Sequence, residues 1–214
     1  MKKIAFFGAS GGLGKKLLPL LQEKYEVIAI SSKDIDVTNF KDVKHFFDNN
    51  HIDIVLNFSG KKYDVFLNRI TEDDMEKTKE MVDVNILGNI NILASCLPQM
   101  RDRSWGRVIL ISSVFAEKNI PKNSVYCSSK AFVDRLAQNA NKENISKGVT
   151  CNSIQLGFWD GGMCYEVPKD IQEKAKKKIG LQRWGSFQEL YNTINFIIEN
   201  EYFCGANLRI DGGL

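Results

Sequence analysis

The stretch GASGGLG at residues 8–14 constrains the fold more than any other part of the sequence. It follows the short apolar run KIAFF and precedes leucines that recur with helical spacing over residues 13–24. Glycines at such a point let the backbone turn sharply and approach a phosphate, and the helix N-terminus supplies N–H donors. The pattern predicts a strand–loop–helix unit that holds the phosphates of a dinucleotide, through Gly8, Ser10, Gly11, Gly12, Leu13 and Gly14.

Strands and helices alternate along the rest of the chain. Further apolar runs predict buried strands at residues 25–31, 53–60, 106–113, 148–156 and 207–213. Helical patterns fill about 72–100 and 125–146, and helix-start signals stand at Asn39, at Thr71 with Asp74, and at Ser186 with Glu189. Near-continuous apolar strands are typical of a parallel sheet covered by helices on both faces. We therefore expect one α/β domain over residues 1–214, built as a Rossmann-like, doubly wound parallel sheet.

The connection after the second predicted strand is unusually short. That strand ends near Ile30, and the segment DVTN begins at Asp36. About five residues cannot hold a helical crossover and a further parallel strand, which together need a dozen or more. We therefore expect that one outer helix–strand unit is missing on the side where the adenine of a dinucleotide would lie.

The bulk composition argues against several classes of function. A formal charge of +3, spread along the chain, is too small to indicate nucleic-acid binding. The sequence has no run of 18 or more apolar residues, so it predicts no membrane span. Five widely spaced cysteines without a C-x-x-C, beside two histidines, do not predict a metal site. We expect a cytoplasmic protein whose thiols are reduced.

Tyr126 and Lys130 lie four residues apart in SVYCSSKAF, which places them on one side of a helix. Such a pair alone is usually a solvated helix face. Two further features favour a site: Ser112 and Ser113 end an apolar strand, where a parallel sheet presents its ligand crevice, and Asn85 interrupts an apolar helical segment.

Taken together with the glycine loop, these residues make the chain resemble a short-chain dehydrogenase/reductase. The family's motifs occur in order from residue 3 to residue 214: GASGGLG, DVTN, NFSG, NILG, LISS, YCSSK, NSIQLGF and GANLRIDGGL. The second half is similar to 3-oxoacyl-(acyl-carrier-protein) reductases. The resemblance implies an oxidoreductase that transfers a hydride between NADP(H) and a small carbonyl or secondary alcohol substrate. It also implies a homo-oligomer assembled through the two long helices, where Phe132, Val133 and Leu136 could serve the interface or the core.

The resemblance assigns roles to four catalytic residues. Tyr126 would be the general acid or base, with its pKa lowered by Lys130 and by an oxidised nicotinamide. Lys130 would also hold the nicotinamide ribose. Ser113, favoured over Ser112 by its interval of thirteen residues from Tyr126, would bond the substrate carbonyl. Asn85 would anchor a water that relays protons to Lys130; its alternative role is a helix-bending polar residue bonded to backbone.

The resemblance also assigns further cofactor contacts, some of them on altered motifs. Asp36 and Val37 match a pair that touches adenine. The remaining matches are Asn57, Ser59 and Gly60 in a strand-end motif where Phe58 replaces an Asn, and Gly157 with Phe158 in a segment where Leu156 replaces a proline. The segment DGGM at 160–163 lacks the family's threonine, so nicotinamide orientation would rely on backbone N–H groups.

The residues after the second strand bear on the choice of cofactor. A hydroxyl and an ammonium, on Ser32 and Lys33, favour the 2′-phosphate of NADP. Asp34 is close enough to favour NAD instead, and Lys33 has the alternative of a solvated loop residue. We therefore expect NADP, with NAD as the alternative.

The substrate should lie among residues 113–120, a loop at about 157–180, and the loop after Gly60. Phe115, Trp159, Met163 and Tyr165 could line an apolar pocket or pack in the core, and Lys61 and Lys62 could meet an anionic substrate or remain solvated. Two other functions stay open. One is a sugar-nucleotide epimerase or dehydratase, disfavoured by the short C-terminal part. The other is a nucleotide-binding regulatory protein without turnover.

Overall fold

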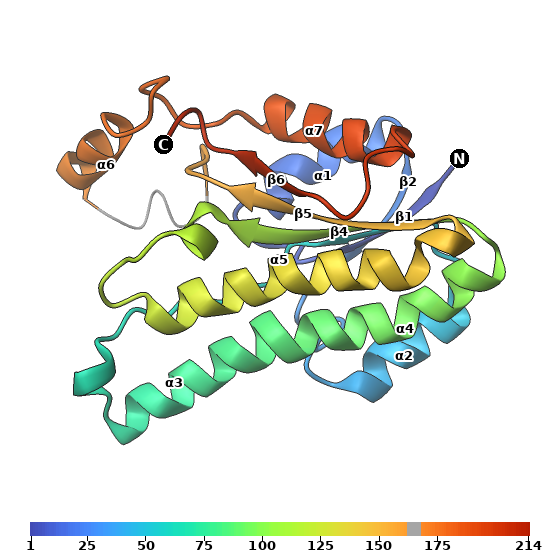
Figure 1. Ribbon diagram of the computed structural model, residues 1–214, viewed down its shortest axis with the longest axis horizontal. Coiled ribbons are helices and arrows are strands. Elements are labelled where there is room, and N and C mark those ends of the chain that lie inside the picture. Colours follow the sequence, from blue (N-terminus) through green and yellow to red (C-terminus); the bar gives the residue numbers. More distant parts are fainter. Residues whose placement is uncertain (162–167) are drawn as a thin grey trace.

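The computed structural model describes residues 1–161 and 168–214, which form a six-stranded parallel sheet between two layers of helices (Figure 1). The strands are β1 (Lys3–Phe7), β2 (Glu26–Ile30), β3 (Ile54–Asn57), β4 (Gly106–Ser113), β5 (Val149–Leu156) and β6 (Asn207–Ile210). The α-helices are α1 (Gly14–Gln22), α2 (Phe40–Asn49), α3 (Glu72–Val82), α4 (Gly88–Asp102), α5 (Ser124–Asn144), α6 (Lys169–Lys176) and α7 (Phe187–Glu199). Shorter turns are η1 (Leu67–Arg69), the π-helical η2 (Asp83–Leu87), η3 (Val114–Glu117) and η4 (Ile145–Lys147).

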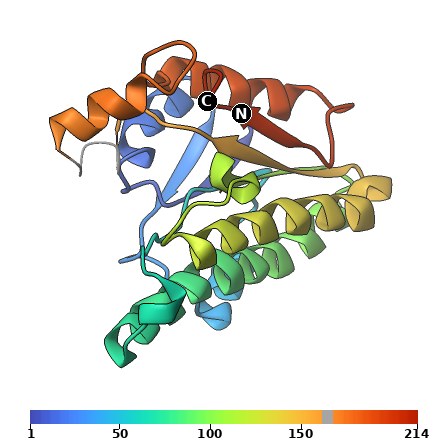
Figure 2. The same ribbon diagram turned by 60° about the vertical axis from the view of Figure 1, so that its left-hand side comes forward.

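The two faces of the sheet have separate apolar cores. Successive strand residues point to opposite faces, so Phe6 packs with α1 and α7 whereas Phe7 packs with α2, α4 and α5. Figure 2 shows the same division, with α1 and α7 on one side of the strands and α2, α4 and α5 on the other. Because both faces are covered, the strands are near-continuous apolar runs, as the sequence indicates.

The sheet order β2-β1-β3-β4-β5-β6 confirms the expected fold class and the expected missing unit. In the usual doubly wound order a further strand lies beyond the second one. Here no described residues pair with the outer side of β2, and a single crossover helix, α2, leads from β2 to β3. The prediction of a buried second strand is therefore wrong: Ile30 is buried, but Glu26 and Ala29 are exposed, because β2 is an edge strand.

The predicted helix starts are confirmed by their hydrogen bonds. The Asn39 side chain accepts the backbone N–H of Lys41, and Thr71 with Asp74 forms a reciprocal capping box. Ser186 and Glu189 form the same arrangement at the start of α7. These short-range signals place the ends of three helices correctly because each depends on residues within one turn.

Helices α3 and α4 are joined through a π-helical turn into one helix of 31 residues, Glu72–Asp102. By length and composition alone, this is the only described helix that could cross a membrane. The sequence pattern predicts no such candidate, because the apolar residues of this helix do not form one continuous run. Its apolar side chains Ile92, Leu93, Cys96 and Met100 are buried against the sheet. Packing in the core therefore accounts for the apolar character of this helix.

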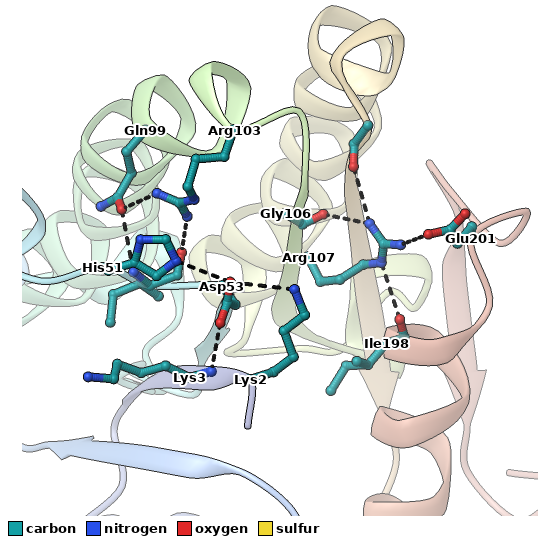
Figure 3. Close-up of polar contacts among 12 residues, drawn as sticks. Lys2, Lys3, His51, Asp53, Gln99, Arg103, Gly106, Arg107, Ile198 and Glu201 are labelled. Carbon is teal, nitrogen blue, oxygen red and sulfur yellow. Dashed lines mark hydrogen bonds and ion pairs between the residues drawn. The ribbon is translucent and has the colours of Figure 1, made fainter.

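The amino end of the sheet is held by polar contacts between strands and helices (Figure 3). The carboxylate of Asp53 accepts the backbone N–H of Lys3 at 2.9 Å. The Arg107 side chain, only 2% exposed, donates to the carbonyl of Ile198 at 3.2 Å and pairs with Glu201 at 2.9 Å. Arg107 thereby fixes the end of α7 to β4.

The carboxyl ends of the strands all lie at the opposite edge, where α6, the start of α3 and the start of α5 gather (Figure 1). A parallel sheet of this kind binds ligands at that edge. Met163, Tyr165 and part of the predicted substrate loop at 157–180 lie outside the described residues.

Candidate active site

The glycine loop after β1 brings its backbone against two other segments. Gly8 has a φ of +78°, and its N–H donates to the carbonyl of Ile30 at 2.9 Å. A Cβ at Gly8 would lie 2.6 Å from the backbone carbon of Phe58, and one at Gly14 would lie 2.3 Å from the carbonyl oxygen of Gly8. Neither position has room for a side chain. The exposed backbone of Ser10, Gly11 and Gly12, with Leu13, therefore stands at the start of α1, a geometry suited to a pyrophosphate.

The loop after β2 carries the residues that bear on the choice between NAD and NADP. The carboxylate of Asp34 accepts the backbone N–H of Ser31 at 2.8 Å and its hydroxyl at 2.6 Å. These hydrogen bonds lower the pKa of Asp34 and fix the carboxylate to its own loop. Ser32 and Lys33 are exposed at the tip of the same turn. The basic side chain is thus more available to a ribose substituent than the acidic one.

Asp36 and Val37 are positioned by the next turn. The Asp36 carboxylate accepts the N–H and the hydroxyl of Thr38, both at 2.9 Å. Val37 is buried against Gly88 of α4, where a Cβ would lie 2.8 Å from its Cγ2, and its carbonyl accepts from Asn91. These contacts place the predicted adenine segment against α4.

The end of β3 forms a polar connection to α4. Asn57, 1% exposed, donates to the side-chain oxygen of Asn89 at 2.8 Å and accepts the backbone N–H and hydroxyl of Ser59. Asn89 donates in turn to the carbonyl of Asn85 at 2.7 Å. A side-chain pair therefore fixes the strand-end loop, although Phe58 replaces a polar residue there and packs edge-on against Phe6.

Tyr126 and Lys130 lie on one face of α5 and are both buried, at 7% and 6% exposure. The Lys130 Nζ lies 5.8 Å from the centre of the Tyr126 ring and donates to the carbonyl of Ile111 at 2.9 Å. Ser113, at the end of β4, lies close enough to the Tyr126 side chain for its hydroxyl to oppose the rise in the phenol pKa that burial causes. Ser112 is buried and donates to the carbonyl of Lys130, so it supports α5. The solvated-face alternative for the Tyr–Lys pair is thereby wrong.

Burial sets the protonation states of this pair. Desolvation raises the pKa of Tyr126 to about 12, against a smaller lowering by the Ser113 hydrogen bond. Desolvation also lowers the pKa of Lys130 to about 8, and Asp134 opposes that effect. The expectation that Lys130 lowers the pKa of Tyr126 is thus not met by the protein alone, because burial dominates. At neutral pH the protein presents a neutral phenol beside an ammonium, which suits donation of a proton.

Asn85 lies in the π-helical turn and is fully buried. Its side chain accepts the backbone N–H of Lys61 and donates to the Lys61 carbonyl, both at 2.9 Å. A Cβ on Gly60 would lie 3.4 Å from Asn85 Oδ1 and 3.5 Å from Lys130 Nζ. The bare backbone of Gly60 therefore lets the two polar groups converge, and the Asn85 side chain is bonded to backbone, as in its alternative role.

Aromatic side chains line the region beyond Tyr126. The Phe115 ring is 6.3 Å from the rings of both Tyr126 and Phe158, and Phe158 is 5.7 Å from Trp184. Trp159 instead packs in the core, 3% exposed, against Gly185. Gly157 approaches Asp211, where a Cβ would lie 2.7 Å from the Cα, so it fastens the end of β5 to the C-terminal segment.

The two lysines after Gly60 have carboxylate partners. Lys61 pairs with Glu80 and Lys62 with Asp64, each at 2.7 Å. These pairs support the solvated-charge alternative over contact with an anionic substrate.

Sequence reasoning missed three residues that support the site. Ser129 accepts from Asn85 at 3.0 Å and donates to the Tyr126 carbonyl. Asn89 links β3 to the π-helical turn, and Asp134 lies one turn beyond Lys130. Asn89 carries a readable signal, because it repeats the polar interruption of Asn85 four residues later in an apolar helix.

The described residues contain no group of three or more His, Cys, Asp or Glu side chains that could hold a metal ion. They do fit a dinucleotide, because the tight packing of Gly8 and Gly14 leaves Ser10, Gly11 and Gly12 exposed at the start of α1, and Gly60 presents bare backbone near Asn85 and Lys130. The site combines this cradle with a proton donor, a cation and a hydroxyl. Such a set can bind a carbonyl oxygen and protonate it.

Comparisons with known proteins agree with this geometry. Residues 3–214 match the family model described as enoyl-(acyl carrier protein) reductase, within the short-chain dehydrogenases/reductases. A 3-oxoacyl-[acyl-carrier-protein] reductase, FabG of Staphylococcus epidermidis, is 27% identical over 165 residues, which cover 76% of this chain and 66% of that relative, just under two thirds. Carbonyl reductase family member 4 of Xenopus laevis is 26% identical over 238 residues, which cover 100% of this chain and 98% of that relative. The structure of ElxO with NADP bound has the same fold, with a TM-score of 0.87 at 22% identity, over 99% of this chain and 98% of that one.

Proposed function

The chain belongs to the short-chain dehydrogenase/reductase family of NAD(P)-dependent oxidoreductases, and on this premise we propose that it transfers a hydride between NADP(H) and a carbonyl or secondary alcohol. The observation that carries the proposal is the convergence of Ser113, Tyr126 and Lys130 at the carboxyl end of β4. Residues 1–214 would form one catalytic domain.

In the reducing direction, a dinucleotide held at the glycine loop would supply the hydride. Ser113 and Tyr126 hold the carbonyl oxygen, and the neutral phenol gives it a proton as negative charge develops there. Lys130, kept as an ammonium at neutral pH, stabilises the phenolate that remains. Asn85, held by the Lys61 backbone, stands next to Lys130 at Gly60, where it supports a water-mediated path for returning the proton.

NADP is the proposed cofactor over NAD. All three residues Ser32, Lys33 and Asp34 are exposed on this turn, but the Asp34 carboxylate already accepts two hydrogen bonds from Ser31. A 2′-phosphate is matched by a hydroxyl and an ammonium. The related ElxO fold holds NADP in its solved structure.

The direct test measures NADPH oxidation with a panel of β-keto thioesters, ketones and quinones. Tyr126→Phe removes the proton donor and should lower kcat on the order of a thousandfold while NADPH still binds. Tyr25→Phe is the matched control, because Tyr25 bonds Asn195 at the amino end of the sheet. Full activity in Tyr126→Phe would refute the mechanism. Tight NADPH binding with no turnover on any carbonyl would instead indicate a nucleotide-binding regulatory protein.

We also infer a homo-oligomer formed by the outer faces of α4 and α5. Leu87 in the π-helical turn and Ile90 in α4 are exposed large apolar residues, and Phe132 in α5 is half-buried. Val133 is fully buried and belongs to the core, and Leu136 packs against it. Light scattering of the protein and of Ile90→Glu should show a shift to lower mass in the variant.

A cytoplasmic location remains a proposal, supported by the state of the cysteines. Within residues 1–161 and 168–214, Cys96, Cys127, Cys151 and Cys204 are all free thiols. Burial raises the pKa of Cys96 and Cys151, so these two are poor nucleophiles.

A further inference from the structure

Asp134 is a buried carboxylate one helical turn beyond Lys130 on α5. Both residues are 6% exposed, and their spacing of four places them on the same face of the helix. That face packs against β4 and β5. A buried charge is unfavourable unless hydrogen bonds and an opposite charge compensate it, so the surroundings of Asp134 must supply both.

Two side chains of β5 fix the Asp134 carboxylate. Ser153 Oγ donates to Oδ1 at 2.6 Å, and Gln155 Nε2 donates to Oδ2 at 2.8 Å. These residues flank Ile154, which is in register with Ile111 of β4. The Ile111 carbonyl is the acceptor of the Lys130 ammonium at 2.9 Å. The carboxylate and the ammonium are thus anchored to adjacent strands at matching register, where strands lie about 4.8 Å apart.

Other charged groups around the site act on different atoms. Burial, and to a smaller extent Asp64 in the loop after Gly60, raises the pKa of Tyr126. Burial also raises the pKa of Cys127, against a smaller opposing effect of Lys62. Glu117 of η3 is connected to Asp134 only through Gln155, at 3.0 Å. Among the described groups, Asp134 is the charge that raises the pKa of Lys130 against the effect of burial.

We propose that Asp134 is a positioning residue that keeps Lys130 in its ammonium form at neutral pH and so sets the alkaline limit of the reaction. Its effect on turnover rests on the proposed function, whereas its effect on the charge of Lys130 does not. Removing the carboxylate charge should shift deprotonation of Lys130 to lower pH. Loss of that ammonium removes the group that stabilises the Tyr126 phenolate.

The first measurement is an NMR titration of the full chain labelled with ¹³C at lysine Cε, with Lys130→Met to assign the signal. In Asp134→Asn the Lys130 midpoint should fall below that of the wild type. Glu117→Gln is the matched control, because it neutralises an exposed carboxylate one step further along the same hydrogen bonds, and it should leave the midpoint unchanged. Asp134→Ser, smaller and also uncharged, tests the same direction if the Asn variant does not fold. An unchanged midpoint in a folded Asp134 variant overturns the proposal.

The second measurement is the pH profile of kcat/KM with NADPH and a reducible carbonyl. If the midpoint falls by about one pH unit, kcat/KM at pH 8 should drop about fivefold, while the value at pH 6 stays the same. A merely structural role of Asp134 would lower both values together, and that result would contradict the proposal. If the wild type reduces no carbonyl, the proposed function fails, and the NMR titration still decides the role of Asp134.

Discussion

Replacing Lys130 with Met should make the protein more stable while abolishing its proposed activity. The Lys130 ammonium is buried, and burial lowers its pKa from 10.5 to about 8. The folded state therefore holds this proton less tightly than the unfolded chain does. At about 1.4 kcal/mol for each tenfold change in proton affinity, charging Lys130 costs folding about 3 kcal/mol at pH 7.

Met fills nearly the same volume with no charge, so Lys130→Met removes this cost. The variant also loses the hydrogen bond to the Ile111 carbonyl, which is worth about 1 kcal/mol. The net expectation is a gain of about 2 kcal/mol at pH 7. The cost in the wild type is complete below the folded pKa of about 8 and disappears as pH rises to the ordinary value of 10.5. The advantage of Met should therefore fall by about 2 kcal/mol between pH 7 and pH 9.5.

Urea unfolding of both proteins at pH 7 and pH 9.5 measures these differences, provided that their m-values agree. Lys142→Met is the matched control, since Lys142 is an exposed lysine of the same helix, and its effect should stay within about 0.5 kcal/mol. The reasoning is refuted if Lys130→Met is less stable than the wild type at pH 7. It is refuted equally if the difference between the two proteins does not change with pH.

Two further predictions concern the ends of the sheet. Arg107→Ala should destabilise the fold by about 3 kcal/mol in urea unfolding, because the Ile198 carbonyl loses its buried donor. Glu201→Gln should cost less than about 1 kcal/mol, because Glu201 is 77% exposed. Equal effects of the two variants would contradict this account. Lys33→Ala should raise KM for NADPH about tenfold and leave KM for NADH unchanged, since only the 2′-phosphate distinguishes the two cofactors. Steady-state kinetics with both cofactors measures this. If Lys33 does not contact the phosphate, the two KM values should change by the same factor.

The sequence alone determined the features that depend on neighbours within a turn or a strand. The alternation of apolar runs and helical patterns predicted the parallel sheet, and the short connection after Ile30 predicted the missing outer strand. Capping at Thr71 and Ser186 is equally local. The spacing of Tyr126 and Lys130 placed both on one helix face, because helical periodicity fixes that relation without any tertiary contact.

Only the tertiary structure decided which of these side chains are buried and what they meet. The sequence indicates that β2 is a buried strand, but Glu26 and Ala29 are exposed, because no described strand lies beyond it. Trp159 is buried in the core, and the ring that contacts Phe158 is that of Trp184, 26 residues further along the chain. Desolvation and the charge of Asp134 set the pKa values of the site, and both arise from segments brought together by folding. A local pattern specifies an element and its faces, whereas electrostatics depend on everything packed around a group, which no single stretch of sequence contains.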